Sequence, residues 1–199
     1  MLCFLYGPGE PGRYHAYELM DNIESYVQRF APLKDSHGCA TEATTEYVRR
    51  MQAGPLPDWP DEVLAEWFRP HHQYLWKYAR LGYEQFLFRK ELWDVERVPR
   101  HEAFDDDWNT DNYTNVESRA ENPDDWLPRF MLENGTWNTP IVLLDNIDNR
   151  CAVEFARTLN SPYHLLEGHR RLSFLIGLRD RNLAAAEHYV WLVTIPETA

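Results

Sequence analysis

Cysteine is scarce in this sequence, and the few cysteines are not paired. Only three occur among 199 residues, without any CxxC pair: Cys3, Cys39 and Cys151. Their odd number and wide spacing argue against a disulfide framework and against a zinc site built on cysteine pairs. Reduced thiols in a cytoplasmic protein are the simplest interpretation.

Long apolar runs are also missing. No stretch of 18 consecutive apolar residues occurs, so a transmembrane helix is not expected. The opening MLCFLYGPGEPG lacks a basic segment and has only a short apolar one, unlike a secretory signal peptide. We therefore expect a cytoplasmic protein that makes no contact with a membrane.

Positive charge is in short supply. Lysine and arginine number 20 against 32 aspartates and glutamates, which gives a formal net charge of -12. Such a chain repels nucleic acid as a whole, so we do not expect nucleic acid to bind over the whole surface. The charge is uneven, because residues 162–199 hold four arginines and four acids and are neutral. Residues 102–125 hold nine acids and one arginine.

Aromatic residues are plentiful enough for a buried core. The chain has eight Trp, eleven Tyr and nine Phe, and 44% of its residues are hydrophobic, which excludes wholesale disorder. Apolar residues at helical spacing predict helices in the first half over 18–30, 41–52, 61–69 and 71–93. We therefore expect residues 1–94 to form a helical N-terminal region.

The second half carries signals for strands as well as helices. A helix is expected over 126–134, with Asp125 as N-cap and Gly135 as its end. A second helix starts near His169, with Leu172, Leu175 and Ile176 on its apolar face. Unbroken apolar runs predict strands within 139–145, 163–167 and 188–196.

Three further stretches carry weaker signals. Residues 94–100, DVERVPR, are expected to form a strand that ends at a proline. The acidic residues 102–125 are expected to form a long polar loop or lid. Residues 146–161 are interpreted as an insertion between two strands.

The order of these elements resembles the ParB/sulfiredoxin-like superfamily. The matching stretches are LPRFMLENGTWNTPIVLLD at 127–145, YHLLEGHRRLSFLIGL at 163–178 and YVWLVTI at 189–195. The resemblance implies an α+β fold, in which the helical region packs on a ParB/sulfiredoxin-like mixed-sheet domain formed by residues 95–199. The reactive cysteine of sulfiredoxin-like members is replaced by Gly168, so reduction of sulfinic acids is not expected.

The turn between the predicted strand 163–167 and the next helix is the best candidate for an anion site. A helix N-terminus exposes unpaired N–H groups and the positive end of the helix dipole. Gly168 allows a ligand to approach the backbone, and His169, Arg170 and Arg171 add donors that suit phosphate oxygens. The resemblance implies that the ligand is a nucleotide, such as a nucleoside triphosphate with Mg²⁺.

Two carboxylates are candidates for catalysis beside this turn. Glu167 ends one strand and precedes the glycine, where it suits a general base or a ligand of Mg²⁺. Asp145 ends the neighbouring predicted strand and is expected to share the same rim. The alternative interpretations are that Glu167 neutralises Arg170 or Arg171, and that Asp145 is a turn residue. For residues 168–171 as a whole, the alternative is a solvated helix start whose arginines pair with nearby acids, such as those of 102–125.

Two functions follow from these residues. The first is a nucleotide-binding, ParB-like protein, acting as a Mg²⁺-dependent phosphohydrolase or phosphotransferase. The second is a non-catalytic protein of plasmid, phage or immunity type, which keeps the fold and uses its acidic residues 102–125 to bind a basic protein partner.

Overall fold

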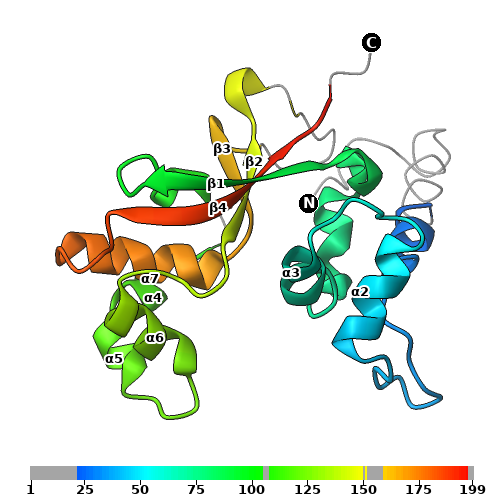
Figure 1. Ribbon diagram of the computed structural model, residues 1–199, viewed down its shortest axis with the longest axis horizontal. Helices are drawn as coiled ribbons and strands as arrows, with labels where there is room; N and C mark the ends of the chain where they lie inside the picture. The colour runs from blue at the N-terminus through cyan, green and yellow to red at the C-terminus, as the bar shows by residue number, and fades with distance from the viewer. Residues whose placement is uncertain (1–21, 105–107, 150, 152–158, 197–199) are drawn as a thin grey trace, which may run out of the picture. The chain divides into compact units, whose positions relative to one another are not determined.

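The protein combines helices with a mixed four-stranded sheet. A computed structural model describes residues 22–104, 108–149, 151 and 159–196 (Figure 1). The chain divides into two compact units, Met1–Glu84 and Gln85–Ala199. The division lies ten residues before the predicted boundary after residue 94, because the strand over 87–94 belongs to the sheet of the second unit. None of the helices in the described residues is long and apolar enough to cross a membrane.

The first unit is helical, as predicted. Residues 22–28 are helical, and the rest of the helix predicted over 18–30 lies partly outside the described residues. The elements that follow are α2 (Thr44–Gln52), α3 (Asp61–Val63), the π-helical η1 (Leu64–Phe68) and the 3₁₀-helices η2 (His72–Leu81) and η3 (Tyr83–Gln85). Their core is largely aromatic, with fully buried side chains that include Phe30, Tyr47, Phe68 and Tyr83.

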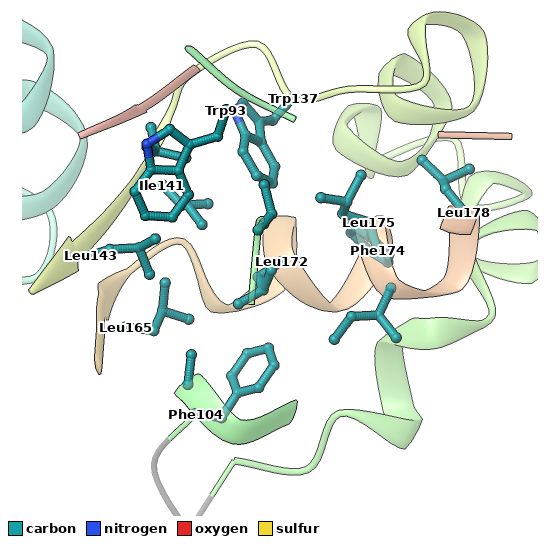
Figure 2. Packing of buried hydrophobic residues seen from close by; sticks show 14 of the residues in the cluster. Trp93, Phe104, Trp137, Ile141, Leu143, Leu165, Leu172, Phe174, Leu175 and Leu178 are labelled. Atoms are coloured by element: carbon teal, nitrogen blue, oxygen red, sulfur yellow. The ribbon is translucent and has the colours of Figure 1, made fainter. Parts of the chain in front are cut away.

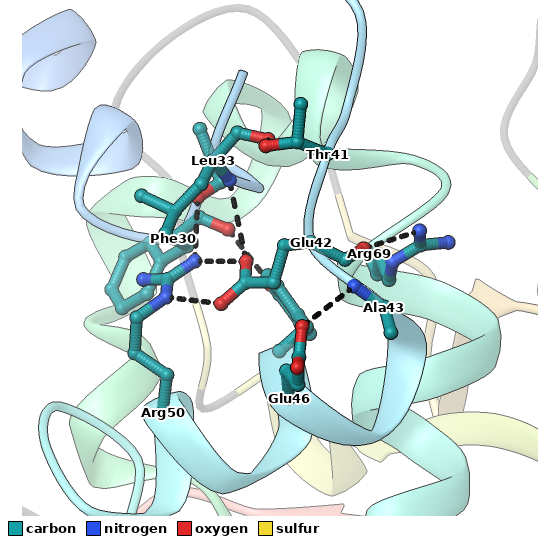
Figure 3. A network of polar contacts seen from close by, with 10 residues as sticks. Phe30, Leu33, Thr41, Glu42, Ala43, Glu46, Arg50 and Arg69 are labelled. Carbon is teal, nitrogen blue, oxygen red and sulfur yellow. Dashed lines mark hydrogen bonds and ion pairs between the residues drawn. The ribbon is translucent and has the colours of Figure 1, made fainter. Parts of the chain in front are cut away.

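A buried ion pair holds α2 to the chain that precedes it (Figure 3). The Glu42 carboxylate is almost fully buried and accepts hydrogen bonds from Nε and Nη2 of Arg50, at 2.7 and 2.8 Å. It also accepts one from the Leu33 amide at 3.2 Å, and Arg50 donates to the Ala31 carbonyl at 2.9 Å. These bonds, chiefly those from Arg50, hold the pKa of Glu42 below its usual range. The network is therefore a structural brace that joins residues 31–33 to α2.

The helix predicted over 71–93 is wrong. The structure has a 3₁₀-helix over 72–81, a left-handed Gly82 (φ +69°) and then the strand β1 (Leu87–Asp94). Apolar residues three apart, such as Leu75, Tyr78 and Leu81, also fit the three-residue turn of a 3₁₀-helix, and all three are buried. Beyond the glycine, β1 pairs along its whole length with β4 (Glu187–Thr194), so sheet pairing overrides the helical spacing.

The sheet of the second unit has the order β1-β4-β2-β3. β2 (Ile141–Asp145) runs parallel to β4, whereas the pairs β1–β4 and β2–β3 (Tyr163–Glu167) are antiparallel. The three strands predicted near 141, 163 and 188 are confirmed. The strand predicted over 94–100 is wrong, because β1 ends at Asp94, whose carboxylate accepts the Glu96 amide at 2.8 Å and starts a turn.

One central helix, α7 (His169–Asp180), lies against the sheet (Figure 2). Its residues from Arg171 to Leu178 are all buried, although the sequence predicted only one buried face. Figure 2 shows Leu172 next to the sheet residues Ile141, Leu143 and Leu165, with Trp93 and Trp137 completing the core. A helix buried along this length needs neighbours on all sides, and α6 (Trp126–Asn134), which is confirmed, is one of them.

The acidic stretch 102–125 is not a loop where the structure describes it. It contains the end of η4 (His101–Ala103), α4 (Asp111–Thr114) and α5 (Val116–Ala120). Both α-helices contact α7, and Val116 is fully buried. The Asn115 side chain caps α5 by accepting the Ser118 amide at 3.3 Å. The apolar residues between the acids therefore pack into the core, and they hold this stretch against α7.

The connection after α6 is fastened to the start of β4. The Ala185 amide donates to the Gly135 carbonyl at 2.9 Å, and Trp137 Nε1 donates to the Tyr189 carbonyl at 2.8 Å. The buried His188 joins both segments, since Nε2 lies 3.0 Å from the Ala185 carbonyl and Nδ1 lies 2.8 Å from the Thr136 hydroxyl. A carbonyl only accepts, so Nε2 carries the proton and the Thr136 hydroxyl donates to Nδ1.

The predicted insertion 146–161 begins with η5 (Ile147–Asn149). The buried Asn146 side chain accepts the Cys151 amide at 2.8 Å and donates to the carbonyls of Leu159 and Asn160, at 3.2 and 3.1 Å. One side chain therefore ties the two described ends of the insertion together.

Gly177→Ala should destabilise the second unit. Alanine in place of glycine within a helix is usually worth about 1 kcal/mol in favour of folding. Here the added Cβ would lie 1.9 Å from the Thr114 carbonyl oxygen of α4, so we expect a loss of about 1–3 kcal/mol, as for overpacked cores. Urea unfolding measures it, and an unchanged or higher midpoint would show that α4 does not press on α7.

His188 should make stability depend on pH. Burial lowers the pKa of His188 below its usual value. Near the usual pKa, this histidine is therefore protonated in the unfolded chain more often than in the folded chain. The free energy of unfolding should therefore fall as the pH drops through about 6.5, at no more than about 1.4 kcal/mol per pH unit. His188→Gln, which keeps a donor for Ala185 and an acceptor for Thr136, should flatten this slope. Equal slopes in both proteins, measured by urea unfolding between about pH 5 and pH 8, would contradict it.

Candidate phosphate site

A left-handed glycine sets the geometry of the site. Gly168 has φ +102° and directly precedes α7. A Cβ built on it would lie 2.6 Å from Cγ2 and 3.2 Å from Cα of Ile141. The register of β2 and β3 shifts between Val142 and Leu143, next to this contact. Both the backbone angle and the space therefore require glycine at this turn.

The helix α7 starts at His169, directly after Gly168, as predicted. The Leu172 amide makes the first intrahelical bond, to the Gly168 carbonyl, at 2.9 Å. The amides of residues 169–171 precede it and lie at the N-terminal end of the helix. The helix is 12 residues long, and its dipole places partial positive charge at this end.

Arg170 lies at the edge of the site between two rings and an acid. Its Nη2 forms an ion pair with Oδ2 of Asp125, just before α6. Its guanidinium carbon lies 5.8 Å from the centre of the Tyr113 ring and 5.6 Å from that of Phe174. The side chain is still 41% exposed, while its Nε is buried and has no hydrogen-bond partner among the described residues. Arg170 is therefore the arginine that a ligand would meet.

Arg171 points into the protein. It is largely buried, and its Nη2 lies 3.7 Å from Oε1 of Glu167, four residues earlier at the end of β3. The prediction that Glu167 pairs with a neighbouring arginine is thus confirmed for Arg171. The acid of the second ion pair, Asp125, was predicted as a helix cap and also belongs to the acids of 102–125 that were predicted as alternative partners of these arginines. Its side chain makes no capping hydrogen bond in the structure.

His169 stands beside a row of aromatic rings. Its ring lies 4.9 Å from Trp108 and 6.0 Å from Phe104. Trp108 is stacked between Phe104 and Tyr113, at 6.4 and 5.2 Å between ring centres. Its Nε1 donates to the Ser173 hydroxyl at 3.0 Å, and Ser173 donates to the His169 carbonyl at 2.8 Å. No periodicity in the sequence marks Trp108 or Tyr113 as neighbours of the site.

Asp145 does not share the rim of Glu167. In the antiparallel pair, Asp145 is opposite Tyr163 at one end and Glu167 is opposite Val142 at the other. Four residues separate the two positions along β3, which corresponds to about 13 Å at about 3.3 Å per residue. The Asp145 carboxylate instead accepts the Ile147 amide at 3.3 Å, as a turn residue does.

The chemistry of the site is therefore one of paired charges around a helix N-terminus. Within the part of the chain that the structure describes, no three His, Cys, Asp or Glu side chains are grouped to hold a metal ion.

A scan against protein-family models and searches of curated proteins and of solved structures find no match to this chain. The resemblance to the ParB/sulfiredoxin-like superfamily stays a prediction, and the site rests on its own geometry.

Gly168→Ala should lower the free energy of unfolding by more than the usual cost of placing alanine in a left-handed conformation. The position itself costs about 1–2 kcal/mol, and the contact with Ile141 adds to it. Gly38→Ala is the matched control, because Gly38 also has a positive φ (+81°) but no atom within 4 Å of the added Cβ. Equal losses for the two variants in urea unfolding would show that Ile141 does not confine this turn.

Proposed function

We propose that the second unit binds the phosphate groups of a nucleotide at the start of α7. The observation that carries this proposal is the left-handed Gly168 packed against Ile141, because it brings the amides of residues 169–171 and the partly exposed Arg170 to one end of a helix. Backbone amides and an arginine together suit an anion that is rich in oxygens.

The ion pairs of the site decide how a phosphate would be accommodated. Arg170 and Arg171 face Asp125 and Glu167, so these four side chains sum to zero charge. A ligand phosphate would exchange with Asp125 as the partner of Arg170, the more exposed of the two arginines. Arg171 would keep Glu167 in place. The affinity for an anion then depends on how much more strongly Arg170 binds the phosphate than it binds Asp125. The negative charge of Asp125 therefore lowers that affinity.

The proposed activity is phosphohydrolysis or phosphoryl transfer, with Glu167 as general base. Glu167 ends β3 immediately before Gly168, so its carboxylate adjoins the proposed phosphates. One carboxylate with nucleotide phosphates is also a usual set of ligands for Mg²⁺. When bound, the ion would neutralise phosphate charge, and Glu167 is the residue that would hold it.

The alternative is that the acidic stretch 102–125 recruits a basic protein partner. Some of its charge is already used within the second unit, since Asp125 pairs with Arg170, and Glu117 with Arg181 at 3.8 Å. Asp105, Asp106 and Asp107 lie outside the described residues. The described contacts therefore favour the phosphate site.

Arg170→Ala should weaken nucleotide binding at least tenfold, or about 1.4 kcal/mol. Isothermal titration of nucleoside triphosphates, with and without Mg²⁺, measures the affinity. Arg181→Ala is the control, because Arg181 lies just beyond the other end of α7 and also pairs with an acid. Asp125→Asn should have the opposite effect and raise the affinity, since it frees Arg170 for the ligand.

The proposal fails if the unaltered protein binds neither nucleotide nor inorganic phosphate. It also fails if Asp125→Asn lowers thermal stability but leaves nucleotide affinity unchanged, because Arg170 would then be only a partner of Asp125. A thermal-shift screen is the quickest first measurement, since a ligand that binds only the folded state raises stability.

A further inference from the structure

The strands β1 and β4 turn one face toward α7 and the other face away from it. Trp93 of β1 and Val190 of β4 belong to the core cluster that contains Leu172 of α7. Successive side chains of a strand point to opposite faces of the sheet, so Leu92 and Tyr189 lie on the face that is turned away from α7. These two side chains are 47% and 53% exposed. Two large apolar side chains therefore stand on a face that the core around α7 does not use.

Leu92 and Tyr189 are directly opposite each other in the antiparallel pair. Just beyond the strands, the Val95 amide donates to the carbonyl of Ala186, its opposite residue, at 2.8 Å. Hydrogen-bonded and non-hydrogen-bonded pairs alternate along an antiparallel ladder, and the side chains of a non-hydrogen-bonded pair lie closer together. Counting back from Val95, Leu92 and Tyr189 form a non-hydrogen-bonded pair. Their side chains therefore make one continuous apolar surface.

The next pair on the same face consists of two acids. Asp94 is directly opposite Glu187, and both residues are exposed. Like charges that face each other across a ladder destabilise it. One oxygen of Asp94 accepts the Glu96 amide at 2.8 Å, but neither Asp94 nor Glu187 forms an ion pair with any of the residues that the structure describes. A cation supplied by a partner would therefore relieve this repulsion.

The lysine on this face is already engaged with aromatic rings. Lys90 Nζ lies 5.6 Å from the centre of the Tyr189 ring and 5.4 Å from that of the Trp191 ring. It forms no ion pair with Asp94 or Glu187, so it does not neutralise the acidic pair. The face therefore presents an apolar pair and, beside it, a pair of negative charges.

We propose that this far face of the β1–β4 pair, formed by Leu92, Asp94, Glu187 and Tyr189, binds an extended segment of a basic protein partner. The segment would carry an arginine and, two residues away, an apolar side chain. Side chains two residues apart on an extended chain lie about 7 Å from each other on one face, which matches the spacing of the acidic and apolar pairs. An arginine can donate to both carboxylates and also stack on an aromatic ring. The proposal is independent of the phosphate site and uses none of the acids of 102–125.

The charge of the face favours this partner over other occupants. A second copy of the chain would bring the same acidic pair and a net charge of -12, so two copies repel each other. Nucleic acid and anionic lipid are negative as well, and Asp94 and Glu187 oppose them. A metal ion would leave Leu92 and Tyr189 unused, and the described residues contain no group of three possible metal ligands.

Fluorescence anisotropy of a labelled short peptide, titrated with the full chain, tests the proposal. The peptide has Arg-Thr-Phe at its centre and threonines on both sides, which favour an extended chain. Tyr189→Ala should weaken binding about fivefold or more, and Asp94→Asn combined with Glu187→Gln about threefold or more, which correspond to about 1 and about 0.7 kcal/mol. Replacing the peptide's arginine by glutamine should abolish the effect of the combined variant, because a double-mutant cycle isolates the contact between the two. Circular dichroism of each variant checks that the fold is retained.

Two variants serve as matched controls. Glu121→Gln combined with Glu133→Gln removes the same charge from other exposed positions of the second unit, and Tyr74→Ala removes a tyrosine that is 52% exposed in the first unit. Both should leave the affinity for the peptide unchanged. The proposal is overturned if the peptide does not bind, if the controls weaken binding as much as the variants of the face, or if the glutamine peptide binds equally well. A dimer in solution that Tyr189→Ala dissociates would assign the face to a second copy and overturn it as well.

Discussion

The second unit depends on the enclosure of α7. Eight consecutive residues of this helix, from Arg171 to Leu178, are buried, so the helix needs neighbours on every side. The sheet supplies one side, and α4, α5 and α6 supply others. Two glycines permit the closest approaches, Gly168 against Ile141 and Gly177 against the backbone of Thr114. A methyl group at either position would separate the layers, and with them the residues at the start of the helix.

The same enclosure explains the charge balance of the candidate site. A buried arginine needs a partner, and Arg171 has Glu167 on the preceding strand. Arg170, one residue earlier, reaches the edge of the helix layer and meets Asp125 before α6. An acidic stretch that looks like solvated surface in the sequence thus contributes a residue to the most basic turn of the chain. The proposed binding of a phosphate at this turn requires that Asp125 be displaced from Arg170.

The two units use aromatic residues differently. In the second, Trp108 stacks on Phe104 and on Tyr113. In the first, Tyr74 and Trp76 are half exposed, and Lys77 Nζ lies over the Tyr74 ring.

The sequence by itself determined the local elements whose signals are strong and self-contained. β2, β3, β4, α6 and the glycine turn before α7 follow from apolar runs, caps and the need for a left-handed residue, all of which are properties of neighbouring residues. Only the tertiary structure decided the rest. Residues 87–94 form a strand because β4 pairs with them, Asp145 lies far from Glu167 because β2 and β3 are antiparallel, and Asp125 reaches Arg170 because α6 and α7 pack together. These outcomes depend on contacts between residues distant in the chain, whose energies exceed the local preferences that a sequence displays.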